Sequence, residues 1–458
     1  MRRPLFIAAL TLAACSVDPP GEGDLEFPCT TDDDCVDGYT CQANVCRTGA
    51  RDGGAATDAG TNRDGGAARD GSTTDGGADR DGGTNGDGGT DRDGGTERDA
   101  GPCDETWCDG ECVDPQVSVA HCGACGFDCA GGACIDGVCQ AFVWQDLPGQ
   151  RPGRLAADAD DLYWTIDASA GGVFQRTFFG GPGPVPVATN QSYPDRLVVS
   201  DQHVAWTALD ERSGPRPGHV RYRDKALAAP LVDVTTATQR SPDGFAIADG
   251  RIFWTVDSPL YLRAHPIGTA VDTYAELQFS GGSSFVQTMV ADDTYVYWFD
   301  ANANLFRVAH ALVGETPDPM LSNQEEEPKD ALLLGDWIYY GDSANGLNTT
   351  GWLRRTNKST FATETLTTRA NPDDETHGVY ALASDGVLLY YTTEAPSGRL
   401  ANVWSIPLAG GTPERVAPVT NPANTSARGL AAVDGVVFWS EWTSDGSTNG
   451  RIRARRVR

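Results

Sequence analysis

Residue types that commonly carry catalysis are sparse in this sequence. Its six histidines form no His-x-x-x-His or His-Glu-x-x-His pair, the spacing that places two metal ligands on one helical face. No Gly-x-Ser-x-Gly turn is present to expose a nucleophilic serine. The sequence therefore predicts no catalytic residue, no metal site and no cofactor, in a protein that is not an enzyme.

Three arginines are the best candidates for binding chemistry. Arg154 and Arg196 directly precede, and Arg428 closely precedes, strands that we predict below to be the innermost of three adjacent repeats. Guanidinium groups present paired N–H donors that match the oxygens of carboxylates, sulfates and acidic sugars. The three arginines form a candidate anion site, unless they pair instead with Asp195, Asp243 or backbone carbonyl groups.

All 13 cysteines lie within the first 139 residues. The run Cys122-x2-Cys125-x3-Cys129 has a spacing that could also hold a metal ion or an iron–sulfur cluster. The composition of the N-terminus indicates export, and setting Cys15 aside leaves an even number of cysteines. Both observations favour disulfides. The twelve disulfide candidates are Cys29, Cys35, Cys41, Cys46, Cys103, Cys108, Cys112, Cys122, Cys125, Cys129, Cys134 and Cys139. The sequence leaves their pairing open.

Residues 1–14 have the composition of an export signal. Two arginines precede an apolar stretch of about 11 residues, which is too short to cross a bilayer that needs about 20. The run Leu12-Ala13-Ala14-Cys15 resembles the lipobox of bacterial lipoproteins, which implies a lipid anchor on Cys15. Ser16 then implies an outer-membrane lipoprotein of a Gram-negative bacterium, facing the periplasm or the cell surface. The alternative is an ordinary cleaved signal followed by a chance cysteine.

Composition divides the rest of the chain into segments. Between residues 50 and 101 no apolar residue is larger than alanine, so little burial can offset the entropy of ordering. The Asp-Gly repeats there could instead bind calcium, but such repeats need a large apolar residue in each unit. The predicted segments are a tether (15–28), a cysteine-rich module (29–46), a disordered linker (47–102), a second cysteine-rich module (103–139) and a repeat domain (141–458). The net charge of −29 argues against a nucleic-acid partner.

The repeat domain contains one apolar and aromatic motif seven times. The anchors are Leu162-Tyr163-Trp164-Thr165, Val204-Ala205-Trp206-Thr207, Ile252-Phe253-Trp254-Thr255, Val296-Tyr297-Trp298-Phe299, Ile338-Tyr339-Tyr340-Gly341, Leu389-Tyr390-Tyr391-Thr392 and Val437-Phe438-Trp439-Ser440. Their third residues are 42, 48, 44, 42, 51 and 48 positions apart. Periods near 45 residues with short β-rich runs are typical of propeller blades. The sequence therefore predicts an all-β, seven-bladed β-propeller.

A fixed hairpin precedes each anchor aromatic. The residue nine positions earlier is apolar in every repeat, and an aspartate lies between the two, often followed by glycine. This pattern indicates a tight hairpin with the anchor aromatics in the core. Asp158, Asp160 and Asp161 could alternatively ligate calcium, although hairpin chemistry already accounts for them.

The two ends of the repeat domain predict how the ring closes. The last repeat ends at Arg458 after its third strand, whereas residues 141–147 form an apolar run outside any repeat. We expect this N-terminal run to supply the outer strand of the last blade, because that pairing removes an open sheet edge.

The anchors resemble the Tyr-Trp-Thr-Asp repeats of low-density lipoprotein receptor propellers, most closely at Tyr297-Trp298-Phe299-Asp300. The run from His121 to Cys129 resembles a cysteine-rich module of secreted proteins from myxobacteria and their relatives. The whole chain resembles propeller lipoproteins of those bacteria. Receptor propellers of this type have six blades, whereas seven anchors are present here.

The expected function is a non-catalytic ligand-binding or scaffold lipoprotein, displayed on the bacterial cell envelope. Its expected partners are the membrane, through the lipid anchor, and a protein, glycan or anionic ligand at the propeller face. The alternative is an extracytoplasmic propeller enzyme, a hydrolase or lyase acting on polysaccharide or lactone, because propeller active sites are built from distant loops. A third possibility is a structural surface protein without a dedicated ligand.

Overall fold

A computed structural model describes part of the chain. It covers residues 39–42, 45–48, 106–178, 181–211, 217–236, 238–240, 242–257, 260–278, 286–322, 328–341, 352–368, 370, 378–394, 400–418, 425–426, 429–443 and 449–458. The chain divides into two compact units, Met1–Gly95 and Thr96–Arg458. Among the described residues, no helix has the length and apolar character needed to cross a membrane.

The first unit contains one described hairpin. Strands β1 (Tyr39–Gln42) and β2 (Val45–Thr48) pair antiparallel, and Cys41 lies directly opposite Cys46. The lipidation candidate Cys15 and the disulfide candidates Cys29 and Cys35 lie outside the described residues.

The second unit begins with a cysteine-rich module. Its elements are β3 (Thr106–Cys108), β4 (Glu111–Val113), a 3-10 turn (Val119–His121), β5 (Cys134–Ile135) and β6 (Val138–Cys139). Three disulfides join Cys108 to Cys125, Cys122 to Cys134 and Cys129 to Cys139. Cys112 is also disulfide-bonded, and Cys103 lies outside the described residues. The prediction of disulfides is therefore confirmed for the described cysteines of this module, and its small core consists largely of buried cystine sulfur.

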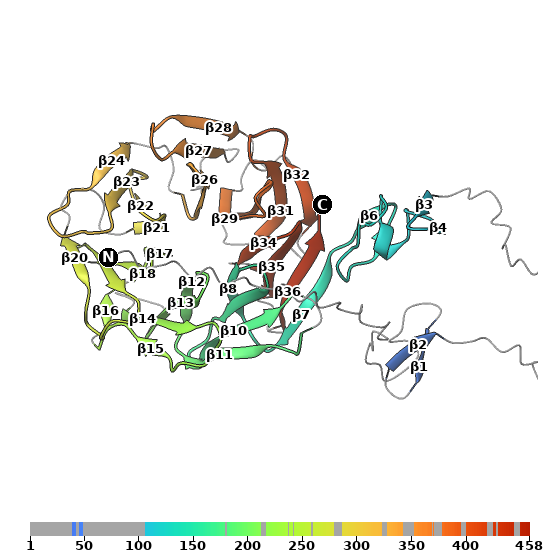
Figure 1. The fold of residues 1–458 in the computed structure, drawn as a ribbon, viewed down its shortest axis with the longest axis horizontal. Coiled ribbons are helices and arrows are strands. Elements are labelled where there is room, and N and C mark those ends of the chain that lie inside the picture. The colour runs from blue at the N-terminus through green and yellow to red at the C-terminus, as the bar shows by residue number, and fades with distance from the viewer. Residues whose placement is uncertain are drawn as a thin grey trace, which may run out of the picture. The chain divides into compact units, whose positions relative to one another are not determined.

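The described residues after this module form seven antiparallel sheets in a ring, as predicted (Figure 1). Blade 1 contains β8 (Pro152–Ala157), β9 (Asp161–Ile166), β10 (Gly171–Thr177) and β11 (Val185–Gln191). Blade 2 contains β12 (Pro194–Val199), β13 (His203–Leu209), β14 (Pro217–Asp224), β15 (Val232–Asp233) and β16 (Gln239–Arg240). Blade 3 contains β17 (Phe245–Ala248), β18 (Arg251–Val256), β19 (Tyr261–Pro266) and β20 (Ala275–Gln278).

The remaining four blades repeat this order. Blade 4 contains β21 (Val286–Ala291), β22 (Tyr295–Asp300), β23 (Leu305–Ala309) and β24 (Asp318–Leu321). Blade 5 contains β25 (Ala331–Leu334), β26 (Trp337–Gly341), β27 (Leu353–Asn357) and β28 (Thr363–Thr367). Blade 6 contains β29 (Gly378–Ser384), β30 (Leu388–Glu394), β31 (Leu400–Pro407) and β32 (Glu414–Pro418). Blade 7 contains β33 (Thr425–Ser426), β34 (Leu430–Val433), β35 (Val436–Thr443), β36 (Asn449–Arg456) and β7 (Phe142–Pro148).

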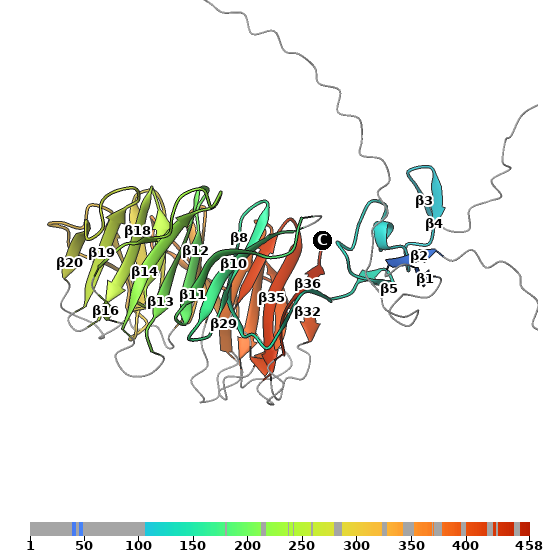
Figure 2. The same cartoon turned by 90° about the horizontal axis from the view of Figure 1, so that it is seen from below.

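The innermost strands contact one another in a closed order. The order is β8, β12, β17, β21, β25, β29 and β34, and β34 contacts β8 again. Figure 2 shows the strands of neighbouring blades running between the same two faces of the ring. Closure occurs as predicted, because β7 pairs antiparallel with β36 and supplies the outer strand of blade 7.

The nine-residue offset in the sequence corresponds to one cross-strand pair in every blade. In blade 1, for example, Leu155 lies directly opposite Trp164. The other pairs are Leu197 with Trp206, Phe245 with Trp254, Met289 with Trp298, Ala331 with Tyr340, Leu382 with Tyr391 and Leu430 with Trp439. All seven anchor aromatics are buried between blades, so the prediction that they form the core is confirmed.

Two hairpin turns also have the backbone conformation that their Asp-Gly sequences predict. Asp249-Gly250 and Asp434-Gly435 both have positive φ at each residue, as a type I′ turn requires. Asp158 acts differently: its carboxylate accepts hydrogen bonds from the N–H groups of Asp160 and Asp161 and closes the turn.

Candidate anion-binding site on the propeller axis

The innermost strands surround a cavity of about 370 Å³ on the propeller axis. Most of its wall consists of small and aliphatic residues from these strands. The charged and hydroxyl groups of the wall lie one or two residues before the apolar residue that pairs with the anchor aromatic, on the side away from the hairpin turns. We call this end the axial mouth, and its polar side chains are Arg154, Arg196, Asp243, Thr288 and Asp330.

A recurring hydroxyl fixes the backbone at the axial mouth. In five blades, a serine or threonine directly after the anchor aromatic accepts a hydrogen bond from the N–H of the residue eleven positions earlier. The donor and acceptor pairs are Arg154 with Thr165, Arg196 with Thr207, Gly244 with Thr255, Ala381 with Thr392 and Gly429 with Ser440. The hydroxyl is buried because it lies between the two strands, so it satisfies an N–H that pairing leaves open.

Blades 4 and 5 depart from this rule. The position of the hydroxyl is occupied by Phe299 in blade 4 and by Gly341 in blade 5. A side chain at Gly341 would collide with Val379 of the next blade, because a Cβ atom there would lie 2.6 Å from the Val379 side chain. The residues at the mouth of these two blades are Thr288 and Asp330.

The two arginines reach across the mouth. Arg196 of blade 2 donates from Nη2 to the backbone carbonyl of Gln287 in blade 4, at 3.0 Å. Arg154 of blade 1 places its guanidinium carbon 5.8 Å from the ring centre of Tyr380 in blade 6. The Nε–H of Arg196 is buried and has no hydrogen-bond partner among the described residues. This guanidinium therefore keeps donor capacity for a further group.

Asp330 faces both arginines, and Asp243 lines the same mouth. Its Oδ1 accepts a hydrogen bond from the N–H of Ala331, and its Oδ2 accepts one from the N–H of Leu382 in blade 6, at 3.1 and 2.9 Å. Burial raises the pKa of Asp330, while the charges of Arg154 and Arg196 oppose that rise. The carboxyl thus serves two purposes, as a backbone acceptor and as a partly compensating charge.

The sequence predictions for this site hold unevenly. Arg154 and Arg196 lie together at the axial mouth, but Arg428 falls outside the described residues. The alternative of pairing with a backbone carbonyl is realised for Arg196. Sequence reasoning missed the role of Asp330, although its register matches that of the two arginines. The glycine at position 341, where five other blades have a serine or threonine, was the feature of the sequence that set blade 5 apart.

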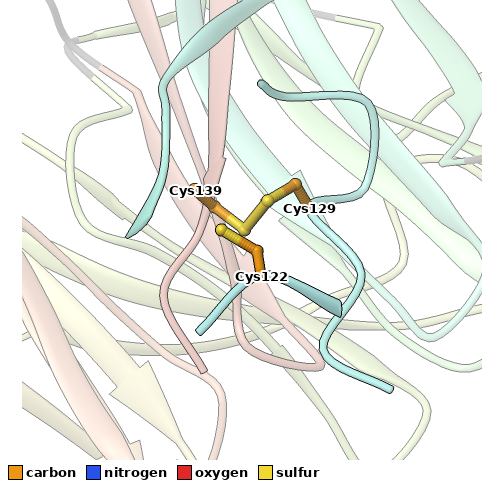
Figure 3. Close-up of side chains that lie close together, drawn as sticks. All are labelled: Cys122, Cys129 and Cys139. Atoms are coloured by element: carbon orange, nitrogen blue, oxygen red, sulfur yellow. A yellow bond between two sulfur atoms is a disulfide. The ribbon is translucent and has the colours of Figure 1, made fainter. Parts of the chain in front are cut away.

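The other chemically suggestive groups have structural partners. Among the described residues, one cluster has metal-ligand geometry, formed by Cys122, Cys129 and Cys139 (Figure 3). Each sulfur of this cluster belongs to a disulfide, so thiolate ligands are not available. The carboxylate of Asp158 accepts hydrogen bonds from its own turn and from the Tyr163 hydroxyl, so its oxygens are already engaged.

Turn aspartates also join neighbouring blades. Lysine or arginine residues at the end of a third strand bind the aspartate in the hairpin turn of the preceding blade. The pairs are Lys225 with Asp158 at 2.6 Å, Lys358 with Asp292 at 2.9 Å and Arg458 with Asp385 at 2.8 Å. Each aspartate also accepts a hydrogen bond from a tyrosine five residues later. These contacts support the ring and leave the axial mouth as the best candidate site.

Comparison with known proteins supports the fold and goes no further. No protein-family model matches the sequence, and no curated protein matches it. The solved WD40 β-propeller domain of Doa1 is 10% identical with a TM-score of 0.50, and the match covers 69% of this chain and 96% of that one. A chain of the mitotic checkpoint complex is 14% identical (TM-score 0.48; 69% and 91% covered), and a prolyl endopeptidase is 12% identical (TM-score 0.45; 66% and 46% covered). The likeness to the Doa1 domain shows a β-propeller fold alone.

Proposed function

We propose that this chain is a non-catalytic binding protein whose propeller holds an anionic ligand at the axial mouth. The observation that carries the proposal is the convergence of Arg154 and Arg196, from adjacent blades, on one end of an axial cavity. A β-propeller supports a binding or scaffold role in general, because its loops and axial end present a rigid surface. Carboxylate, sulfate and phosphate groups match the guanidinium donors.

The donor groups of the mouth favour a compact anion over a cation. Two carboxyl groups, Asp243 and Asp330, share the mouth with the two guanidiniums, and backbone N–H groups already occupy both oxygens of Asp330. The buried Nε–H of Arg196 still lacks a partner among the described residues. An anion entering the mouth would meet the guanidinium groups of both Arg154 and Arg196 there.

The test is calorimetric titration with sulfate and with a sulfated glycan. Arg154→Glu combined with Arg196→Glu should weaken binding at least tenfold, because each substitution replaces an attractive charge with a repulsive one. Arg251→Glu is the control for each single substitution, since it makes the same charge change on a hairpin turn at the other end of the strands, where Arg251 pairs with Asp249. Unchanged affinity in the double variant would refute the proposed site.

We further propose that the protein is lipid-anchored through Cys15 in the outer membrane and displays the propeller there. The support is the lipobox-like run that ends at Cys15. Two or three acyl chains would hold it firmly, whereas one would not. Mass spectrometry of the mature N-terminus should find an acylated cysteine, and Cys15→Ala should release the protein from membranes. An unmodified N-terminus beyond residue 15 would contradict the anchor.

The absence of turnover is part of the same proposal. A ligand isolated with the protein from envelope extracts should be recovered chemically unchanged after long incubation. Conversion of polysaccharide or lactone substrates, lost on substitution at the axial mouth, would favour a propeller enzyme instead.

A further inference from the structure

Blade 5 is one of the two blades that lack the recurring hydroxyl group, and its residue at the axial mouth is Asp330. Five blades satisfy the innermost backbone N–H with a neutral serine or threonine hydroxyl. In blade 5 the position of the hydroxyl is occupied by Gly341. The Val379 side chain leaves no room there for a larger residue. The residue of blade 5 at this mouth is Asp330, whose carboxyl group accepts hydrogen bonds from the N–H groups of Ala331 and Leu382.

The surroundings of Asp330 are polar on several sides. Arg154 faces it from blade 1 and Arg196 from blade 2, and both charges act on it. Blade 3 contributes the buried Asp243 and blade 4 contributes Thr288 to the same mouth. Blade 6 offers the N–H of Leu382, blade 7 contributes Leu430 to the wall, and Lys329 precedes Asp330 in its own blade.

An anion at this mouth would meet the same two guanidiniums as Asp330. The ionised carboxylate and the anion would repel each other across a buried site, where charge interactions are strong. A protonated Asp330 carries no charge, so it would not repel the anion. From this geometry we propose that Asp330 is an internal counter-ion, so that its protonation strengthens the binding of an anion at the axial mouth. This inference rests on the proposed anion site and adds its regulation.

The direction of the pH dependence follows from linkage. An anion stabilises the protonated form of Asp330, so binding takes up a proton and affinity rises as pH falls through the pKa of Asp330. Burial raises the pKa of Asp330 above the ordinary aspartate value of 3.8, so the change in affinity lies at a higher pH than a free aspartate would give.

Sulfate is the probe, because its charge is constant over the pH range needed. Its dissociation constant would be measured by calorimetry between pH 4.5 and 8 at fixed ionic strength, for the wild-type chain and for Asp330→Asn. Wild-type affinity should rise about tenfold as pH falls. Asp330→Asn should bind sulfate about tenfold more tightly than wild type at pH 8 and should lose most of the pH dependence.

A matched control separates this effect from general acid behaviour. Asp318→Asn also removes a carboxylate that pairs with an arginine, Arg307, but this pair lies on the outer strands of blade 4. Its sulfate titration should keep the wild-type pH dependence. Circular dichroism would verify that both variants are folded, and Asp330→Ser provides a second neutral residue that can still accept a backbone N–H.

The outcomes distinguish the two proposals. Sulfate binding that is absent at every pH, in wild type and in both neutral variants, refutes the anion site itself. Binding with equal pH dependence in wild type and in Asp330→Asn or Asp330→Ser leaves the anion site standing and overturns the counter-ion role. Weaker sulfate binding in the neutral variants at pH 8 also overturns it, since Asp330 would then support the site only as a backbone acceptor.

Discussion

Replacing Trp144 with alanine removes the largest side chain of β7, the strand that completes blade 7. The Trp144 ring packs edge-on against Trp164 of blade 1 and Phe438 of blade 7, with ring centres 6.2 and 5.4 Å away. The guanidinium of Arg176 lies 4.7 Å from its ring centre. The side chain therefore joins the N-terminal run to both the first and the last blade.

The expected cost can be worked from these contacts. Truncating a buried tryptophan to alanine costs about 3–5 kcal/mol. The indole N–H also donates to the backbone carbonyl of Phe178 at 3.1 Å, and losing a bond of this kind costs about 1 kcal/mol. The contributions overlap, so we expect Trp144→Ala to lower the free energy of unfolding by about 4 kcal/mol.

Urea unfolding, followed by tryptophan fluorescence and circular dichroism, would measure this loss. Trp107→Ala is the matched control, because Trp107 is 53% exposed in the cysteine-rich module and should cost under about 0.5 kcal/mol. Equal destabilisation of the two variants would refute the reasoning, since it would mean that β7 contributes no more to the ring than an exposed side chain does.

Two further predictions concern the recurring contacts of the blades. Thr255→Val keeps the shape of the side chain but leaves the N–H of Gly244 without its acceptor, so thermal unfolding should show a loss of about 1–3 kcal/mol; unchanged stability would contradict the hydroxyl rule. Asp292→Asn weakens the contact with Lys358 between blades 4 and 5 and should cost about 2 kcal/mol at neutral pH. Burial alone would raise the pKa of Asp292, but the hydrogen bonds from Lys358, the backbone and Tyr297 together lower it below 3.8, so this stabilisation is present above that value and is lost as pH falls below it. A difference between wild type and Asp292→Asn that grows as pH falls below 3.8 would contradict this assignment.

The architecture could be predicted from the sequence because each blade repeats the same residue pattern and the same strand pairing. The offset of nine residues between Leu155 and Trp164 is the register of one cross-strand pair, and the same register recurs in all seven blades. Closure by β7 could be predicted because the last repeat lacks a fourth strand and residues 141–147 lack a repeat. Both inferences depend on the repeating spacing of apolar and aromatic residues, which can be read directly from the sequence.

The candidate site was only partly accessible, because its contacts join residues distant in the chain. Arg154 and Arg196 could be placed at the mouth from register alone. The approach of Asp330 to both arginines, and its bond to Leu382, depend on how seven blades meet around the axis. Disulfide pairing was open for a similar reason: Cys134 lies opposite Cys139 in a hairpin, yet each is bonded to a different, earlier cysteine.

The most direct test of the anion site is a crystal structure of the protein soaked in selenate, with anomalous data collected at the selenium edge. We predict an anomalous peak at the axial mouth, within hydrogen-bonding distance of the Arg154 and Arg196 guanidiniums, that disappears in the Arg154→Glu and Arg196→Glu double variant. Selenate bound elsewhere on the protein, with no peak between these two arginines, would contradict the account.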